Sequence, residues 1–458
     1  MNYQISNFFK TCTILTLVFL VCFLTGLIPP ANADVIYHAF NEPFDQIRAE
    51  IPQLKEQGYT YIQISPPQLS NPSSEWWARY QPIDFTVLES PLGNEEDLKE
   101  LIDAAHQQEE KIIVDVVLNH MANYGDYPYT LQYPRFSPDN FHPRVCIQNY
   151  DDAYQATHGW LGLDCNSGQG GLPDLNTESD YVRQELKNYL TTLLDLGVDG
   201  FRIDALKHIE EGFFQTVLND IPDNIYFYGE VVEGRPIDAL RYIGIHNIDV
   251  TDYPLLGAIK NALGLGGDLR SLMNPASYNA ALPGPNAVTF AKTHDTLPGS
   301  LLYSSYGMDQ LDSLLANAFV LSREDGLPLI YRDDAEEPIV QAGVKFHEQM
   351  TGQAQYFRSG NEIAAEADNP NLLFIERGNE GIAMINKSGN FFDVPIAQMP
   401  GLDVGCYQEL HYNFTMSVGL DQNGQKIITR WGNPTRGGIQ IGPRDALFFV
   451  KSADQTCQ

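Results

Sequence analysis

The sequence predicts an α/β protein: a (β/α)8 TIM barrel with a loop-rich inserted domain after the third strand and a C-terminal antiparallel β domain. Three observations lead to this fold class. Short apolar runs alternate with amphipathic helical stretches in about eight units, the number that closes a parallel barrel. One stretch rich in Tyr, Pro, Gly, Asn and Asp interrupts the alternation. Near the C-terminus the pattern changes to short alternating segments between Gly and Asn turns, which is typical of antiparallel sheets.

The chain begins with a segment that we expect to be removed from the mature protein. Lys10 precedes an apolar run over residues 12–27, and the small residues of Ala-Asn-Ala end at Ala33. This pattern predicts a secretory signal peptide over residues 1–33, with export to the extracellular space or the periplasm. An uncleaved anchor is the alternative, but the run is short for a membrane span. No comparable run follows, so a soluble mature protein is expected.

The composition narrows the possible partners. The formal net charge of −31 and the pI of about 4.5 argue against nucleic acid, because phosphate binding needs clustered basic residues. The 43% hydrophobic and 11% aromatic content favours a folded globular protein. An acidic surface suits divalent cations and a neutral substrate, although a solvated surface without any partner is the simpler interpretation. We expect a monomer with no nucleic-acid or membrane partner.

The first part of the barrel is expected over residues 34–120. Gly58 follows an amphipathic stretch and is a suitable helix C-cap. The next helix starts with acidic residues, which favour a helix N-terminus. The third strand is rich in Val and Ile, which is typical of a strand buried on both faces. The expected strands cover residues 34–40, 59–65 and 111–120, and the expected helices cover 44–58 and 94–110.

The rest of the chain completes the domain organisation. Residues 121–176 are expected to form the inserted domain, and the alternation resumes over 177–351 to complete the barrel. Residues 352–458 are expected to form the β domain, with strands such as "NLLFIERG", "GIAMINKS" and "DALFFVKS". The remaining barrel strands are expected near 198–204, 224–232, 246–253, 286–295 and 327–333, and the helices near 180–197, 212–221, 236–243, 255–263, 311–324 and 340–350.

Four cysteines remain after the signal peptide, because Cys12 and Cys22 leave with it. An even number in an exported protein fits two disulfides. Three pairings are possible, and proximity along the chain favours one of them. No C-x-x-C spacing is present, which disfavours a zinc site. The favoured pairs are Cys146–Cys165 and Cys406–Cys457.

Polar residues mark the ends of several barrel strands, where functional side chains lie in this fold. Asp204, Glu230 and Asp295 follow three different strands. Arg202 stands two residues before Asp204, so both side chains share one face of a strand. One carboxylate on an apolar strand can be part of a structural ion pair. Three of them at the same rim predict a catalytic site.

Paired carboxylates are the groups that glycoside hydrolysis requires. Arg202 would keep Asp204 ionised, as a nucleophile requires. Glu230 lies between aromatic residues and two valines, and such an apolar setting would let it hold a proton as the general acid. His120 and His294 could bond sugar hydroxyls, although a single histidine is more often a satisfied core residue.

Five separated motifs carry a resemblance to a known family. They are "DVVLNH", "LPDLN", "GFRIDALKH", "GEVVEG" and "AKTHD", in this order. In this order, on a barrel pattern, they resemble the α-amylase family, glycoside hydrolase family 13, and the similarity extends over the whole mature chain. The resemblance implies a retaining enzyme that hydrolyses α-1,4 bonds in α-glucans.

The resemblance also implies roles for individual residues. Asp204 matches the nucleophile, Glu230 the acid/base and Asp295 the carboxylate that stabilises the transition state. Retention predicts that the carboxyl groups of Asp204 and Glu230 lie about 5–5.5 Å apart. The implied substrate-binding residues are Trp76, Trp77, Tyr80, Gln81, His120, Arg202, Lys207, His208 and His294.

Two stretches resemble different branches of the family. "EWWARYQPIDF" resembles the animal-type α-amylases, and its Trp76 and Trp77 are candidates for stacking on glucose rings. Aromatic core packing is the alternative for each tryptophan. "NFHPRVCIQNY" in the insertion resembles fungal α-amylases.

The family resemblance further implies a structural Ca²⁺ between barrel and insertion. Asn119 and Asp174 match side-chain ligands, and His208 matches a ligand through its backbone carbonyl. Oxygen ligands suit Ca²⁺. A further ligand from the insertion is expected within "NYDDAYQATHGWLGLDCN". For Asn119 a turn-stabilising amide is the alternative.

Chloride is a second ion that the resemblance raises. Animal-type enzymes bind chloride with two basic residues and an Asn, and here Thr293 occupies the position of that Asn. Arg202 matches one basic residue, and Arg332 is a candidate for the other. One alternative is therefore a chloride site formed by the two arginines without the Asn amide. The other is that the protein binds no chloride.

Three functions are compatible with these motifs. The leading one is a secreted endo-acting α-amylase acting on starch, glycogen and maltodextrins. The second is a family member that forms one short maltooligosaccharide or transfers glucosyl units with the same three carboxylates. The third is a non-catalytic carbohydrate-binding relative. It is disfavoured because Asp204, Glu230 and Asp295 are all present.

Overall fold

The structure is a computed structural model. It describes residues 34–123, 133–162, 165, 170–243, 248–358, 360–363, 368–394, 401–430, 439–453 and 457. The predicted signal peptide, residues 1–33, lies outside the described residues. Within the described ranges, no helix combines the length and apolar character that crossing a membrane requires.

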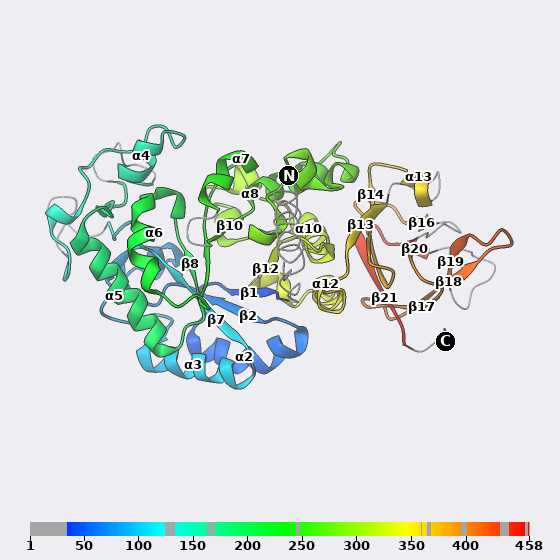
Figure 1. The fold of residues 1–458 in the computed structure, drawn as a ribbon, viewed down its shortest axis with the longest axis horizontal. Helices are drawn as coiled ribbons and strands as arrows, with labels where there is room; N and C mark the ends of the chain where they lie inside the picture. Colours follow the sequence, from blue (N-terminus) through cyan, green and yellow to red (C-terminus); the bar gives the residue numbers. More distant parts are fainter. Residues whose placement is uncertain are drawn as a thin grey trace, which may run out of the picture. The chain divides into compact units, whose positions relative to one another are not determined.

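Eight parallel strands close into a barrel (Figure 1), which confirms the predicted fold class. Around the barrel their order is β1-β12-β11-β10-β9-β8-β7-β2, so each strand lies beside its neighbour in the chain once the small additional strands are set aside. This is the arrangement of repeated strand–helix units. The strands are β1 (Ile36–Ala39), β2 (Tyr61–Ile64), β7 (Lys111–Val116), β8 (Gly200–Ile203), β9 (Tyr226–Gly229), β10 (Asp249–Thr251), β11 (Ala287–Phe290) and β12 (Leu327–Tyr331).

The predicted helices between the strands are present, although α6 ends at Val217 rather than near 221, and the short helices α9 and α11 were not predicted. Helix α2 ends at Gly58, whose φ of 102° is a left-handed conformation that glycine adopts at little cost. Helix α3 begins at a capping box formed by Asn94 and Asp97. The predicted helix over 236–243 is shorter, because α7 ends after four residues and a 3-10 turn follows. The helices are α2 (Phe44–Gln57), α3 (Glu95–Gln107), α5 (Asp180–Leu196), α6 (Glu211–Val217), α7 (Pro236–Ala239), α8 (Tyr253–Leu263), α9 (Tyr303–Tyr306), α10 (Gln310–Ser322), α11 (Arg332–Ala335) and α12 (Pro338–Gln349).

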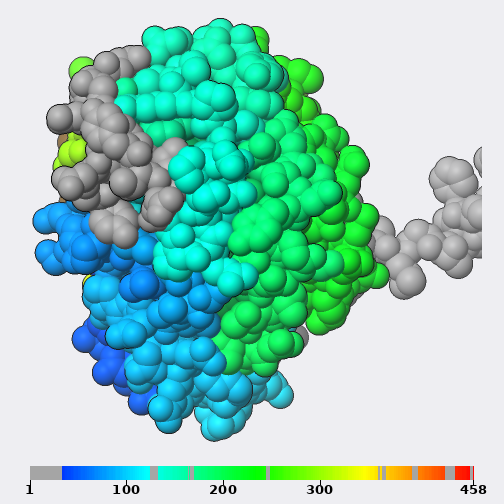
Figure 2. Space-filling view, turned by 90° about the vertical axis from the view of Figure 1, so that its left-hand side faces the viewer, coloured from blue at the N-terminus to red at the C-terminus, as the bar shows by residue number. Residues whose placement is uncertain are grey.

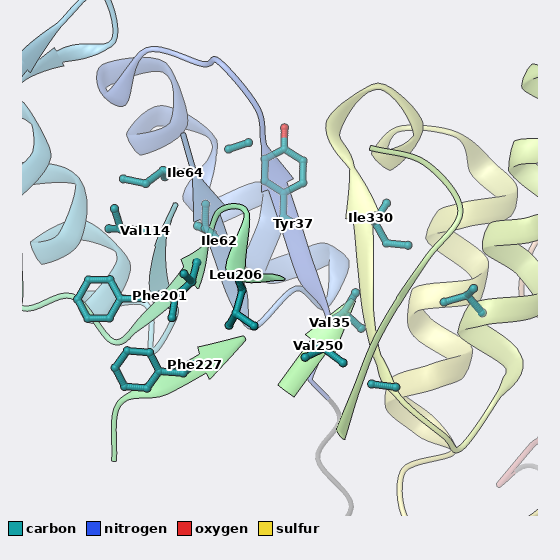
Figure 3. Close-up of a cluster of buried hydrophobic side chains, with 14 of the residues drawn as sticks. Val35, Tyr37, Ile62, Ile64, Val114, Phe201, Leu206, Phe227, Val250 and Ile330 are labelled. Carbon is teal, nitrogen blue, oxygen red and sulfur yellow. The ribbon is translucent and has the colours of Figure 1, made fainter. Parts of the chain in front are cut away.

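Barrel strands are buried on both faces, and alternate residues enter different apolar clusters. On β7, Ile112 and Val114 belong to a cluster that extends to the helices, whereas Ile113 belongs to a second cluster with Tyr228. Figure 3 shows part of the first cluster, including Phe201 of β8 beside Phe227 of β9, with the rings 5.5 Å apart. Because side chains alternate along a strand, residues such as Asp115 and Arg202 share the second face.

The described part of the insertion contains little regular structure, as its composition predicts. Its helix α4 (Ala153–His158) is capped by the side chain of Asp152. The predicted disulfide Cys146–Cys165 is present. An isolated bridge between His120 and Asp174 ties the end of the segment to the barrel. In Figure 2 this part, in cyan-green, lies against barrel segments coloured blue and green.

The loop after β2 holds elements that the sequence pattern does not predict. They include a 3-10 helix over Trp76–Tyr80, which places two tryptophans on one short turn. Two small ribbons accompany it, made of strands too short to show any periodicity. The strands are β3 (Leu69–Ser70), β4 (Pro82–Asp84), β5 (Glu89–Ser90) and β6 (Gly93–Asn94).

The C-terminal part is an antiparallel β structure, as predicted. Its seven-stranded sheet has the order β13-β14-β15-β21-β17-β18-β19, and β16 pairs with β20. The disulfide Cys406–Cys457 is present. Phe448 of β21 lies 5.5 Å from Phe346 of α12, measured between ring centroids, so the sheet packs on the last barrel helix. The elements are β13 (Gln355–Arg358), α13 (Gly360–Ile363), β14 (Leu372–Arg377), β15 (Gly381–Asn386), β16 (Phe392–Val394), β17 (Gly405–Glu409), β18 (Thr415–Leu420), β19 (Lys426–Arg430), β20 (Ile439–Ile441) and β21 (Asp445–Lys451).

Candidate active site

The three predicted carboxylates stand at the ends of three barrel strands. Asp204 follows β8, Glu230 follows β9, and Asp295 lies in a 3-10 helix shortly after β11. The backbone N–H of Asp204 donates to Val116 O, and that of Glu230 donates to Ile203 O, both at 2.9 Å. The parallel ladder therefore continues one residue beyond the strands and holds these two carboxylates at one rim.

A cavity of about 500 Å³ opens at this rim, and all three carboxylates line it. Most of the predicted substrate-binding residues line it too, so residues from distant parts of the sequence meet there. These are Trp76, Trp77, Tyr80, Gln81, His120, Lys207, His208 and His294. Sequence reasoning missed seven further lining residues: Ala205 directly after Asp204, Tyr150, Leu161 and Leu172 from the insertion, and Val232, Leu301 and Leu302 from strand ends and loops.

Arg202 lies beneath the cavity and joins the carboxylates. Its Nη1 donates to Asp204 Oδ1 at 2.7 Å, as predicted, and also to Asp115 Oδ1 at 2.8 Å. Its Nη2 lies 2.9 Å from Glu230 Oε1. The guanidinium therefore serves three carboxyl groups rather than Asp204 alone. Sequence reasoning did not predict the contact of Arg202 with Asp115. The position of Asp115, two residues after the inward-facing Ile113 on the same strand, indicates that its side chain points inward as well.

Ala205, directly after Asp204, has a strained backbone. Its φ of 48° lies in the left-handed region, which is uncommon for a residue with a Cβ atom. This turn directs the Ala205 N–H toward Glu230, where it donates to Oε2 at 3.2 Å. Strain of this kind persists where the surrounding structure fixes it, often at a functional site.

Burial changes the proton affinity of the whole carboxyl cluster. Burial raises the pKa of Asp204, and the Arg202 charge opposes this rise. Burial also raises the pKa of Glu230, where Arg202 opposes and Asp204 adds to the rise. The pKa of Asp295 is raised well above its ordinary value by burial and the charge of Glu230, and burial raises that of Asp115 to about 7. Such a cluster favours holding a proton on one carboxyl near neutral pH.

The histidines of the cavity are held in their neutral form. Burial lowers the pKa of His120 to about 4, and its Nε2 donates to Tyr80 O at 3.0 Å. Burial and the neighbouring His38 and Arg202 lower the pKa of His294 well below its ordinary value. Among the described residues, the buried Nδ1 atoms of His120 and His294 have no hydrogen-bond partner. Neutral rings with a free nitrogen are suited to neutral hydroxyl groups.

The two tryptophans differ in their surroundings. Trp76 packs edge-on against Phe40, with ring centroids 5.6 Å apart, and against His294 at 5.2 Å. Trp77 is 40% exposed, so core packing does not account for it. Both line the cavity, and an exposed aromatic ring at a cavity mouth is suited to stacking.

Two cavity residues are also tied to their surroundings. Lys207 Nζ lies 2.7 Å from Glu233 Oε1. His208 Nδ1 donates to the carbonyl of Ala156 in α4 at 2.8 Å. The insertion is therefore connected to the rim of the barrel next to Asp204.

The predicted calcium ligands Asn119 and Asp174 are in contact and buried. Asn119 Nδ2 donates to Asp174 Oδ1 at 3.1 Å, while Asn119 Oδ1 is a buried oxygen without a hydrogen-bond partner among the described residues. Asp174 Oδ2 accepts from His142 Nδ1 at 2.6 Å, a contact that sequence reasoning missed. An unpartnered amide oxygen beside a buried carboxylate fits a hard, oxygen-binding cation.

The two candidate chloride ligands have different hydrogen-bond partners in the structure. Arg332 Nη1 donates to Phe40 O at 3.1 Å and lies 3.0 Å from Glu42 Oε1. In the part of the chain that the structure describes, Arg202, Thr293 and Leu329 line a small inner cavity, and Arg332 is not among its lining residues. In the structure the positive charge of Arg332 is therefore paired with Glu42.

Comparisons with known proteins bear on this site. The family described as "Alpha amylase, catalytic domain" matches residues 44–234. An α-amylase of Aeromonas hydrophila is 32% identical over 408 residues, which cover 78% of this chain and 85% of the relative. Both matches include the strand ends that hold Asp204 and Glu230.

Solved structures show the same fold at lower identity. A mutant of α-amylase I from Eisenia fetida, in complex with maltohexaose, superimposes with a TM-score of 0.75 at 20% identity, over 92% of this chain and 97% of that chain. A cyclomaltodextrin glucanotransferase with a three-domain ABC distribution gives a TM-score of 0.67 at 18% identity, over 91% and 99%. From the Aeromonas match over most of both chains, together with the barrel and the strand-end carboxylates, it follows that this chain belongs to the α-amylase family and is a glycoside hydrolase.

Proposed function

We propose that the protein is a secreted, endo-acting α-amylase that hydrolyses α-1,4-glucosidic bonds of starch, glycogen and maltodextrins with retention of configuration. One observation carries the proposal: Asp204, Glu230 and Asp295 line a single cavity, with Arg202 beneath joining two of them. The catalytic barrel comprises residues 34–120 and 177–351. It is interrupted by the inserted domain, 121–176, and followed by the β domain, 352–458.

The reaction has two displacements. In the first, an Asp204 oxygen attacks the anomeric carbon while the Glu230 carboxyl gives its proton to the leaving glucosidic oxygen. In the second, Glu230, now ionised, takes a proton from water, whose oxygen attacks the same carbon and releases Asp204. Asp295 stabilises the positive charge that develops on the sugar ring in both transition states. The raised pKa of Glu230 supports its role as acid.

The walls of the cavity bind the glucan chain. Trp76, Trp77 and Tyr80 offer aromatic faces to glucose rings, and Gln81 offers an amide for hydroxyl groups. The neutral His120 and His294 bind hydroxyls of the sugar that is cleaved. Lys207 and His208 bind the next sugar along the chain. These assignments are supported by their common position around the three carboxylates.

Calcium is proposed as a structural cation. Asn119 Oδ1, the Asp174 carboxylate and the backbone carbonyl of His208 would hold it, and its charge would join the barrel to the insertion. It takes no part in the displacements. The unpartnered Asn119 oxygen supports this proposal.

Export is proposed on two grounds. The segment over residues 1–33 has the pattern of a signal peptide. The disulfides Cys146–Cys165 and Cys406–Cys457 are of a kind that persists in oxidising compartments.

A transferring or single-product enzyme is the second candidate. The observation in its favour is the apolar lining of Leu161, Leu172, Val232, Leu301 and Leu302, because a dry wall beside the intermediate disfavours water and favours a sugar acceptor.

Product analysis tests the proposal. The mature protein is incubated with soluble starch, with and without a calcium chelator, and product sizes are followed over time. Rapid loss of long chains with a spread of maltooligosaccharides is expected, together with loss of activity on chelation. One short product from the outset, or products longer than the substrate supplied, would favour the second candidate. Absence of any cleavage with calcium present would contradict both.

A further inference from the structure

Three metal-binding side chains of the insertion meet outside the cavity. His142 and His158 each direct Nε2 at the carboxylate of Glu178, at 3.0 Å from Oε2 and 2.9 Å from Oε1 respectively. The ligand atoms of the three residues all lie within 4.8 Å of one another. None of them is among the described residues that line the catalytic cavity.

The hydrogen bonds of His142 decide which of its nitrogens faces Glu178 with a lone pair. Its Nδ1 lies 2.6 Å from Asp174 Oδ2. A carboxylate oxygen accepts, so Nδ1 carries the proton and donates. In the neutral ring Nε2 is then an acceptor, and it faces the Glu178 carboxylate, which is an acceptor as well.

The same holds for His158. The hydroxyl of Thr157 donates to Ala153 O at 2.9 Å, so its oxygen has only lone pairs left for His158 Nδ1 at 2.8 Å. Nδ1 is therefore the donor, and the Nε2 of the neutral ring again faces a carboxylate oxygen. The lone pairs of these two Nε2 atoms repel the Glu178 carboxylate unless positive charge lies between them. One divalent metal ion can supply that charge, and so can a proton on each imidazole ring.

We propose that His142, His158 and Glu178 bind one zinc-type divalent ion. Two imidazoles and a carboxylate are a ligand set that zinc accepts, with a fourth position left for water. The Glu178 side chain is exposed, with 41% of it accessible, so the ion and a water can reach the site from solvent. The four cysteines that follow the predicted signal peptide are all in disulfides, which excludes a cysteine-based site and leaves a histidine-based one open.

Neighbouring side chains orient the two histidine ligands by hydrogen bonds, as is usual around metal sites. Asp174 orients His142 through Nδ1, which is the carboxylate–histidine–metal arrangement. Thr157 orients His158 in the same way, and the Tyr154 ring stacks on His158 with centroids 4.1 Å apart. Asp174 is also a proposed calcium ligand, so the two ions would be joined through one carboxylate. No step of the proposed hydrolysis requires the zinc ion.

Zinc binding at saturating calcium is the test. The mature protein is dialysed against Zn²⁺ with excess Ca²⁺, and bound zinc is counted per chain by elemental analysis. One zinc per chain is expected for the wild type. The His158→Ala/Glu178→Gln double variant is expected to lose it. His106→Ala, which removes an exposed histidine paired with Asp199, is the matched control and is expected to keep it.

A second variant separates orientation from ligation. Thr157→Val removes the hydroxyl that accepts the hydrogen bond from His158 Nδ1, but it leaves all three zinc ligands in place. Zinc affinity is therefore expected to fall about 10–100-fold, with one site per chain retained. Melting curves check that each variant is folded. The proposal is overturned if the folded wild type takes up no zinc, which would leave two protonated rings around Glu178, or if the double variant takes up as much zinc as the wild type. Because the readout is bound metal, these outcomes are independent of starch hydrolysis.

Discussion

At the residue scale, Arg202 organises the site. One buried guanidinium contacts Asp115, Asp204 and Glu230 within 2.9 Å. Its positive charge opposes the effect of burial on each of these carboxyl groups. Without it the three groups would be buried carboxyls with no cation to balance them, and such groups are costly.

Replacing Arg202 tests this arrangement. In Arg202→Met the free energy of unfolding at pH 7 is expected to fall by about 3 to 5 kcal/mol, because the carboxyl groups lose their only close cation among the described residues. Urea denaturation measures the change. Arg48→Met, which removes a surface pair with Glu100, is the control and should cost about 1 kcal/mol or less. A cost for Arg202→Met as small as that of the control would contradict the account.

The strand-end rule and the motifs predict the reactive residues from the sequence. Asp204, Glu230 and Asp295 line the cavity because strand ends of a parallel barrel meet at one rim. Tyr150 and Leu161 line it too, but their place depends on how the insertion folds over the barrel, and no local pattern records that. Arg332, a candidate chloride ligand, pairs with Glu42, a contact that its place in the sequence does not indicate.

At the element scale, the end of β9 is packed so tightly that only glycine fits. A Cβ atom on Gly229 would lie 2.8 Å from the Cβ of Leu206, in the turn after Asp204. Real Cβ atoms do not approach so closely, so β9 or the turn would have to shift. Either shift moves a catalytic carboxylate, because Glu230 follows Gly229 directly.

Gly229→Ala is therefore expected to affect both stability and turnover. Overpacking should lower the free energy of unfolding by about 1 to 3 kcal/mol, and kcat should fall with it. Gly389→Ala, where nothing lies within 4 Å of the added methyl group, is the matched control. Thermal melts and starch hydrolysis measure the two effects. Wild-type kcat in Gly229→Ala would show that the β9 end tolerates the methyl group.

A second element-scale prediction concerns Glu110, at the junction of α3 and β7. Burial raises its pKa to about 7, and the charge of Lys55 only partly opposes this. The folded protein therefore binds this proton more tightly than the unfolded chain, whose carboxyl titrates near pH 4.3. The stability from this group is present below about pH 4 and is lost as the pH rises to 7.

Glu110→Gln removes this pH-dependent loss. At pH 8 the variant is expected to be more stable than the wild type by on the order of 2 kcal/mol, with little difference at pH 4. Urea unfolding at the two pH values measures this. The exposed neighbour Glu109, changed to Gln, is the control. An equal effect of Glu110→Gln at both pH values would contradict the assigned proton.

The long elements were predictable and the short ones were not. The strand over Lys111–Val116 has a continuous apolar run, and α2 has a clear C-cap at Gly58, so their sequences specify them locally. The 3-10 helix Trp76–Tyr80 and the two-residue strands near it have too few residues to show a period. They form because contacts with distant parts of the chain hold them, such as that of Trp76 with His294.

At the scale of the whole molecule, calcium is expected to join the insertion to the barrel. A ligand at 100 times its Kd stabilises the folded state by about 2.7 kcal/mol, so chelation should lower the melting temperature. Differential scanning calorimetry with and without chelator measures this, and added calcium should restore the melting temperature. In Asp174→Asn the response to calcium should be strongly reduced. A melting temperature that does not change on chelation would contradict the calcium proposal.

The central claim is that Asp204 attacks the sugar, and the turnover of Asp204→Asn on soluble starch tests it most directly. Asp249→Asn is the control, since Asp249 is also a barrel-strand carboxylate but accepts from Tyr226 and does not line the cavity among the described residues. The account predicts that kcat falls by about three orders of magnitude or more in Asp204→Asn, with the melting temperature retained and the control close to wild type. A folded Asp204→Asn variant with kcat within about tenfold of the wild type would contradict it.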